Sequence, residues 1–120
     1  MRSSNDIVLG THLHRVRLPG VMAERVDLET ERELDTALHK YRPDTVVHTV
    51  GLTNVDECER NIERSRYVNV DLAENVARAT HRAGVRLVHI STDHLFTGDR
   101  PLHTETDIPN PLNAYARTKL

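Results

Sequence analysis

The chain has 120 residues, a formal net charge of -2, a pI near 6.4 and 38% hydrophobic residues. This length suits one modest domain, and the charge argues against the basic footprint of a nucleic-acid-binding domain. No apolar run approaches the roughly 20 residues that a membrane span needs, and the first residues lack the pattern of a signal peptide. Cys58 is the only cysteine. An internal disulfide is therefore excluded, which suits a reducing cytoplasm.

The first half of the chain alternates between strand and helix patterns. Residues 7–14 predict a buried strand, and residues 20–27 predict a second, shorter one. Thr30 followed by Glu33 is typical of a helix start with a capping box. Residues 45–50 are rich in β-branched side chains and predict a third strand.

The second half continues the same alternation. Residues 55–82 carry a helical pattern with a joint at Asn61, and Gly84 suits the C-terminal cap. Residues 85–90 predict a fourth strand, and Asn113 is a suitable N-cap for a last helix. Strands separated by helices indicate an α/β fold with a parallel sheet.

Three segments at expected strand ends are candidates for a binding site. Ligands bind at the carboxyl ends of strands in an open α/β sheet. Polar or glycine-containing segments follow three of the strands, at residues 27–28, 51–54 and 91–93. Strand ends are also polar simply because they reach solvent, so these segments alone leave both interpretations open.

A tyrosine and a lysine at the start of the last helix favour a catalytic interpretation. Tyr115 and Lys119 are four residues apart, hence on one helix face. A phenol ionises at about pH 10, and a nearby ammonium favours the phenolate, so such a phenol can exchange a proton with a substrate oxygen. Thr92, at a strand end, offers a hydroxyl for the same oxygen. The tyrosine–lysine spacing is weak alone, but it becomes specific together with residues 91–93.

Residues 42–119 resemble the extended short-chain dehydrogenase/reductases, and are most similar to their dTDP-4-dehydrorhamnose reductase branch. The resemblance implies an α/β fold, a partial NAD(P)-binding Rossmann-like doubly wound parallel sheet, over a single domain of residues 1–120. It rests on residues 43–48 leading into 51–59, residues 68–70, residues 89–98 and residues 110–119.

The resemblance also implies an activity, the reduction of the C4 keto group of a nucleotide-linked deoxy-sugar. Thr92, Tyr115 and Lys119 match the catalytic triad of the family. Tyr115 would give a proton to the keto oxygen, Thr92 would hold that oxygen, and Lys119 would favour the ionised phenol and hold the nicotinamide ribose. The hydride would come from NADPH or NADH.

Further positions match binding residues of the family. Asp93 matches a contact with the sugar nucleotide, and Asn69 matches a helix asparagine that supports the site. The expected cofactor-binding set comprises Asp27 and Leu28 beside the adenine, Gly51, Leu52 and Thr53 along the cofactor, and Tyr115 and Lys119 at the nicotinamide.

Three residues near the end of the first predicted strand bear on cofactor choice. An acid beside the adenosine ribose favours NAD, whereas a base accommodates a 2′-phosphate. His12, His14 and Arg15 supply no acid, so they favour NADP over NAD. His12 and His14 also alternate as zinc ligands can, but no cysteine or carboxylate pattern completes a site, so we expect no metal.

The chain departs from the family at its start. Its five glycines form no G-x-x-G-x-x-G phosphate loop. In the 3-2-1-4-5 strand order the first strand is central. Without that strand, residues 7–14 and 45–50 lack their shared neighbour and expose unpaired edges. We therefore expect a fragment of a longer reductase, inactive alone.

The expected parent is a cytoplasmic enzyme that binds a nucleotide sugar but neither nucleic acid nor membrane, with a homodimer as one possible assembly. Two alternatives stay open. One is another extended short-chain dehydrogenase, a sugar-nucleotide epimerase or dehydratase. The other is a non-catalytic regulatory subunit resembling that of methionine adenosyltransferase.

Overall fold

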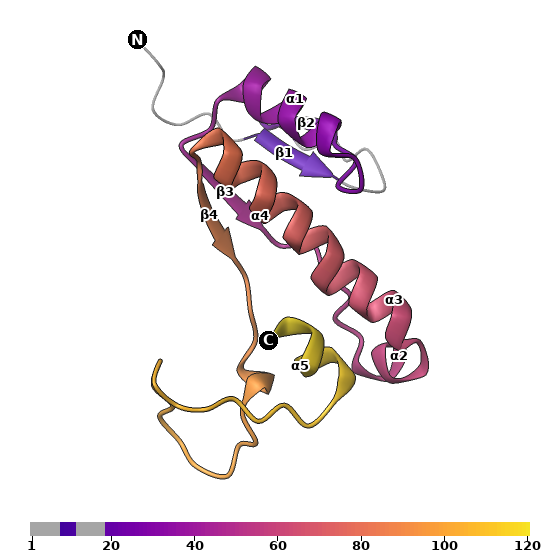
Figure 1. The fold of residues 1–120 in the computed structure, drawn as a ribbon, viewed down its shortest axis with the longest axis vertical. Coiled ribbons are helices and arrows are strands. Elements are labelled where there is room, and N and C mark those ends of the chain that lie inside the picture. Colours follow the sequence, from indigo (N-terminus) through magenta and orange to yellow (C-terminus); the bar gives the residue numbers. More distant parts are fainter. Residues whose placement is uncertain (1–7, 12–18) are drawn as a thin grey trace. The chain divides into compact units, whose positions relative to one another are not determined.

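The computed structural model describes residues 8–11 and 19–120 (Figure 1). The chain divides into two compact units. The first unit comprises residues 75–87 together with the described residues up to Val46. The second unit comprises residues 47–74 and 88–120. Within the described ranges, no helix has the length and apolar character needed to cross a membrane.

The first unit contains a parallel strand pair and two helical segments. Strands β1 (Val8–Thr11) and β2 (Met22–Arg25) pair from Val8 opposite Met22 to Thr11 opposite Arg25. Helix α1 (Glu31–Tyr41) follows, and most of α4 (Leu72–Ala83) belongs to the same unit. The buried side chains of the first unit come from the turn before α1, from α1 and from α4. They are Leu28, Leu34, Val76, Ala79 and Thr80.

Helix α1 begins after Thr30 as predicted, but the capping box is absent. The Thr30 side chain makes no cap hydrogen bond, and only its carbonyl accepts from Glu33 N, at 3.0 Å. The Glu33 carboxylate instead accepts from Asp27 N at 2.8 Å. The capping-box prediction was therefore wrong. The Glu33 carboxylate accepts a hydrogen bond from the backbone N–H of Asp27, in the preceding turn, instead of from that of Thr30. At the other end, Arg42 adopts a left-handed conformation with φ 45° and closes the helix.

The second unit contains the predicted joint in the helical run. Helix α2 (Val55–Arg60) and helix α3 (Ile62–Arg66) meet at Asn61. The Asn61 side chain accepts from Arg64 N at 3.0 Å, so it caps α3 where α2 ends. A π-helical turn, η1 (Tyr67–Asp71), then leads into α4. Such turns inside helices frequently mark functional sites.

Strands β3 (Thr45–His48) and β4 (Arg86–His89) form a second two-stranded sheet, extended by a hydrogen bond from Ile90 N to His48 O at 3.2 Å. The 3-10 turn η2 (Asp93–Leu95) and helix α5 (Ala114–Lys119) complete the second unit. Within the described residues the strands pair two by two, β1 with β2 and β3 with β4.

Candidate active site

The structure brings the expected catalytic segments together inside the second unit. Gly51, Leu52 and Thr53 follow β3, Thr92 is the N-cap of η2 after β4, and Tyr115 and Lys119 lie on α5. A Cβ placed on Gly51 would lie 4.0 Å from Lys119 Nζ, and Ser91 Oγ donates to Lys119 O at 3.3 Å. Helix α5 also contacts η2. The ends of both strands therefore converge on one helix.

The Thr92 hydroxyl is engaged by its own turn. Its Oγ1 accepts from His94 N at 3.2 Å and lies 3.4 Å from Asp93 Oδ1. The His94 ring in turn meets the half-buried Tyr115 ring edge-on, with centroids 5.7 Å apart. In this part of the described chain, no hydrogen bond joins the Tyr115 hydroxyl to Thr92 or to Lys119. The three side chains thus share one unit, without the direct contacts of an assembled triad.

The Lys119 ammonium contacts a histidine that sequence reasoning missed. Lys119 Nζ lies 3.2 Å from Nε2 of His89, the last residue of β4. The His89 ring stacks on that of His48, the last residue of β3, with centroids 5.3 Å apart and planes at 19°. A signal was present in the sequence, because two predicted neighbouring strands both contain Val-His near their ends.

Burial sets the protonation of this cluster. Burial, with smaller contributions from His89 and Lys119, lowers the pKa of His48 to about 4. Burial and the Lys119 charge lower the pKa of His89, and burial lowers the pKa of Lys119. His48 is thus a neutral side chain at pH 7, and its buried Nε2 has no hydrogen-bond partner.

Asn69 on the π-helical turn connects the segment after β3 to α5. Its Oδ1 accepts from Leu52 N at 2.7 Å, and its Nδ2 donates to Leu52 O at 3.1 Å and to Thr118 Oγ1 at 2.9 Å. Thr118 Oγ1 also lies 3.2 Å from Ser65 Oγ. Asn69 and Ser65 are buried, so these hydrogen bonds are shielded from water. They hold the backbone at residues 51–53 near the helix that carries Tyr115 and Lys119.

Helix α5 is held at its start by a carboxylate from α2. Glu59 Oε1 accepts from Ala114 N at 2.5 Å and lies 3.6 Å from Arg117 Nη2. The Asn113 side chain accepts from Ala116 N at 2.8 Å, which confirms the predicted N-cap. Glu59 is itself exposed and lies among other charged residues of α2. The structure gives this residue a specific role at the N-terminus of α5, where negative charge is favourable.

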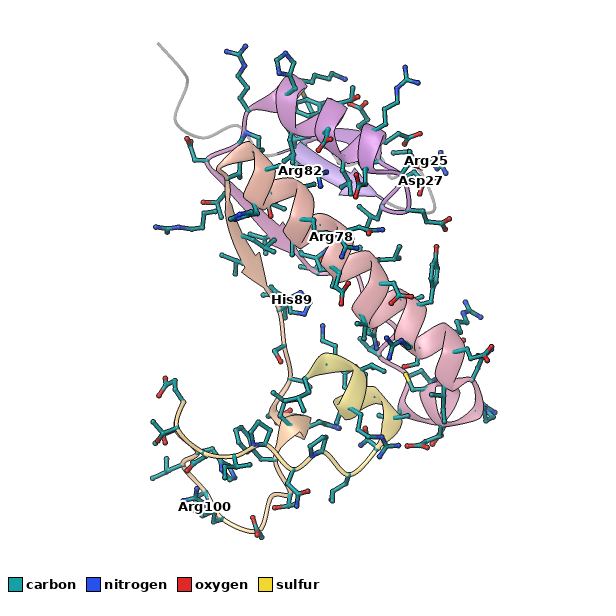
Figure 2. The ribbon with its side chains drawn as sticks, viewed as in Figure 1. Arg25, Asp27, Arg78, Arg82, His89 and Arg100 are labelled. Atoms are coloured by element: carbon teal, nitrogen blue, oxygen red, sulfur yellow. The ribbon has the colours of Figure 1, made fainter. Side chains whose placement is uncertain are left out.

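The expected adenine-side residues lie in the first unit. Asp27 Oδ1 accepts from Glu29 N at 2.9 Å, and Asp27 Oδ2 lies 4.0 Å from Arg25 Nη2 (Figure 2). Leu28 is buried, and its carbonyl accepts from Asn75 Nδ2 at 3.0 Å. The structure therefore places Asp27 and Leu28 in a different unit from the rest of the predicted site.

The remaining ligand predictions concern nicotinamide cofactor type and metal. His12, His14 and Arg15, which favoured NADP, lie outside the described residues. Among residues 8–11 and 19–120, no group of three or more His, Cys, Asp or Glu side chains is arranged to hold a metal ion.

Comparisons with known proteins agree on one family. A family model described as the RmlD substrate binding domain matches residues 8–120. The dTDP-4-dehydrorhamnose reductase of Salmonella typhimurium is 38% identical over 96 residues, which cover 78% of this chain and 32% of that protein. Methionine adenosyltransferase 2 subunit beta of Bos taurus is 34% identical over 97 residues, covering 81% of this chain and 29% of that protein.

A solved structure gives the same fold. The crystal structure of dTDP-4-dehydrorhamnose reductase from Bacillus anthracis, in complex with NADP, superposes with a TM-score of 0.77 at 26% identity. The match covers 95% of this chain and 46% of that one. The parallel-sheet α/β architecture expected from the sequence is thus confirmed. The chain spans about a third of the length of the curated relatives it matches.

Proposed function

Because the chain belongs to the RmlD substrate binding domain family, we propose that it carries the catalytic segment of an NAD(P)H-dependent reductase. The substrate is a nucleotide-linked deoxy-sugar with a keto group at C4, as in dTDP-4-dehydrorhamnose. The observation that carries the proposal is the convergence of the segments bearing Thr92, Tyr115 and Lys119 in one compact unit. We propose that the parent protein acts in the cytoplasm, with a homodimer as its assembly.

The end of β3 brings a group that suits a nicotinamide cofactor close to the backbone. Gly51 bears no side chain, and a Cβ there would lie 3.2 Å from Asn69 Oδ1 and 4.0 Å from Lys119 Nζ, so the glycine allows this strand end to pack against both side chains. The half-buried Lys119 ammonium beside it is a donor for ribose hydroxyl groups. We assign Gly51, Leu52 and Thr53 to the cofactor, with Asp27 and Leu28 on the adenine side. When bound, the cofactor supplies the hydride that reduces the keto carbon.

The chain's own residues handle the proton and the keto oxygen. Tyr115 Oη donates a proton to that oxygen, which becomes a hydroxyl group as the carbon is reduced. Thr92 Oγ1 turns from its cap on His94 N to hold the same oxygen, and Asp93 contacts the sugar nucleotide. The Lys119 charge favours the ionised phenol after proton transfer. Because Thr92 and Tyr115 make no contact with each other here, the substrate oxygen itself is the bridge between them.

The proposal is tested with Tyr115→Phe in the whole protein, since the 120 residues alone are expected to be inactive. Removal of the phenolic hydroxyl removes general acid catalysis, which contributes about 10²–10⁴-fold to rate. We expect NADPH oxidation with the keto-sugar to fall by about that factor, while calorimetry gives unchanged NADPH affinity. Tyr41→Phe, in α1 of the first unit, is the matched control. Turnover by Tyr115→Phe close to wild type would refute the proton-donor role.

A non-catalytic role is a second candidate, favoured by the similarity to methionine adenosyltransferase 2 subunit beta. In that role the chain would bind a partner protein, and the catalytic set would be retained without turnover. The two candidates separate in one titration series. NADPH binding with keto-sugar reduction supports the reductase. Binding of a methionine adenosyltransferase catalytic subunit, with no reduction by any form of the protein, supports the regulatory role.

A further inference from the structure

His89 makes a contact that none of the expected catalytic roles uses. It ends β4, as Figure 2 shows, and its Nε2 lies 3.2 Å from Lys119 Nζ. An ammonium has three donors and no acceptor, whereas a neutral imidazole has one donor and one acceptor. A hydrogen bond between these two atoms with Lys119 charged therefore requires Nε2 to accept. The His89 proton is then on Nδ1, and the ring is neutral.

The His48 ring stacks against one face of the His89 ring. The His48 side chain is buried, with the whole residue 5% exposed, and the two rings lie nearly parallel at 5.3 Å. A charged His48 would repel the Lys119 ammonium, but burial lowers the pKa of His48 to about 4. His48 is therefore an uncharged platform that fixes the plane of the His89 ring.

We propose that His89 is a positioning residue whose Nε2 accepts a hydrogen bond from the Lys119 ammonium and holds it beside Gly51. Lysine carries its charge on a flexible four-carbon stem, so a free ammonium samples many positions. The end of β4 restrains Lys119 twice, because Ser91 Oγ donates to its carbonyl while His89 receives its ammonium. The role of this restraint in cofactor binding rests on the proposed reductase function. The hydrogen bond between His89 and Lys119 does not depend on that function.

The role makes the site sensitive to pH in a defined way. The titratable groups that face His89 are His48 from β3 and Lys119 from α5. Protonation of His89 converts Nε2 into a donor and places a second positive charge against the ammonium. Lys119 is then released. NADPH affinity should therefore decrease as the pH is lowered and His89 becomes charged. A glutamine at position 89 offers a neutral amide oxygen as acceptor and does not titrate.

The contact is tested by NMR on the full 120-residue chain. Long-range proton–nitrogen correlation reports which ring nitrogen of each histidine carries the proton. We expect His89 to be protonated on Nδ1 and bare on Nε2 at pH 7. We further expect His89→Leu to lower the pKa of Lys119 below that in the wild type, because the charged form loses its acceptor. A protonated Nε2, or a Lys119 titration unchanged in His89→Leu, would overturn the inference.

The function of the contact is tested by NADPH titration of three variants of the whole protein, because the 120 residues contain no glycine-rich phosphate loop. His89→Leu should weaken NADPH binding about tenfold, the size of one hydrogen bond to a charged group. His89→Gln should retain affinity within about twofold and lose the pH dependence. His81→Leu, an exposed position on α4, is the control. Equal affinity and pH dependence in wild type and His89→Leu would overturn the positioning role. If the wild type itself binds no NADPH, the reductase proposal fails, while the NMR result still decides whether His89 holds Lys119.

Discussion

Both units have ion pairs at the surface, but in the second unit a buried polar side chain, Asn69, also connects separate segments of the chain. Lys40 pairs with Glu24 at 2.6 Å and Arg82 with Asp35 at 3.0 Å, all at least a third exposed (Figure 2 labels Arg82). In the second unit, buried Asn69 bonds the backbone of Leu52 and the hydroxyl of Thr118.

The difference teaches which polar contacts determine structure. An exposed ion pair contributes about 0–1 kcal/mol, because solvent screens it and the side chains lose entropy. A buried hydrogen-bonded group leaves its partners without water when it is removed, which costs about 1–3 kcal/mol per unsatisfied group. The second unit therefore owes the arrangement of its site to a few polar residues, and four substitutions test this contrast.

The largest expected effect comes from Asn69→Ala. Loss of the amide leaves Leu52 N without its acceptor and removes one of the hydrogen bonds of the Thr118 hydroxyl, so we expect the free energy of unfolding to fall by about 2–3 kcal/mol. Asn75→Ala, in the first unit, is the matched control, and loss of its bond to Leu28 O should cost about 1 kcal/mol. Urea denaturation measures both, and equal costs would remove the contrast between the units.

A pH effect follows from His48. Its pKa is about 4 when folded and about 6.5 when unfolded, so between these values only the unfolded chain binds the proton. Its contribution to stability is complete above about pH 6.5, declines as pH falls to 4 and is constant below. Allowing for solvent screening at the strand end, we expect a loss of about 2 kcal/mol. His48→Asn should flatten this part of the stability profile, and His39→Asn, at an exposed position of α1, is the control substitution.

A smaller effect is expected from Gly51→Ala. The new Cβ lies 3.2 Å from Asn69 Oδ1, so the buried amide must shift, at a cost of about 1 kcal/mol. Gly10→Ala in the first unit places its Cβ 3.8 Å from Val26 Cγ2, an ordinary contact. Thermal denaturation should show a lower Tm for Gly51→Ala alone. An unchanged Tm would mean that Asn69 is not held tightly.

The smallest effect is expected from Arg82→Gln. Its ion pairs with Asp35 and Glu31 are exposed, so their loss should change the free energy of unfolding by about 0.5 kcal/mol or less. Urea denaturation at low and high salt measures the change. A loss above 2 kcal/mol would show that surface charges also shape the first unit.

Much of the fold was predictable because local chemistry determines it. The Asn61 joint and the Asn113 cap were predicted from asparagines whose side chains accept from helix N–H groups, and both are confirmed. The capping box at Thr30 was not predictable, because Asp27 N competes for the Glu33 carboxylate and that competition depends on the turn's conformation.

The candidate site was predictable only in part. Segments bearing Thr92, Tyr115 and Lys119 were expected to converge, because strand ends and a following helix meet at one edge of a parallel sheet. The contact of Lys119 with His89 and the bond from Ala114 N to Glu59 depend on side chains 30 and 55 positions apart. The Val-His ends of two neighbouring strands point to the histidine pair, but nothing in the sequence links His89 to Lys119 or Glu59 to the Ala114 backbone, so these contacts require coordinates.

The contacts that hold α5 have a consequence for how its two expected catalytic side chains could be transferred to another protein. Tyr115 and Lys119 owe their positions to hydrogen bonds between α5 and the helical run of residues 55–71. Glu59 holds its first turn, and Ser65 and Asn69 hold its last through Thr118. A graft of residues 113–120 alone would therefore transfer Tyr115 and Lys119 without the contacts that position them. The smallest transplantable module also includes residues 54–71.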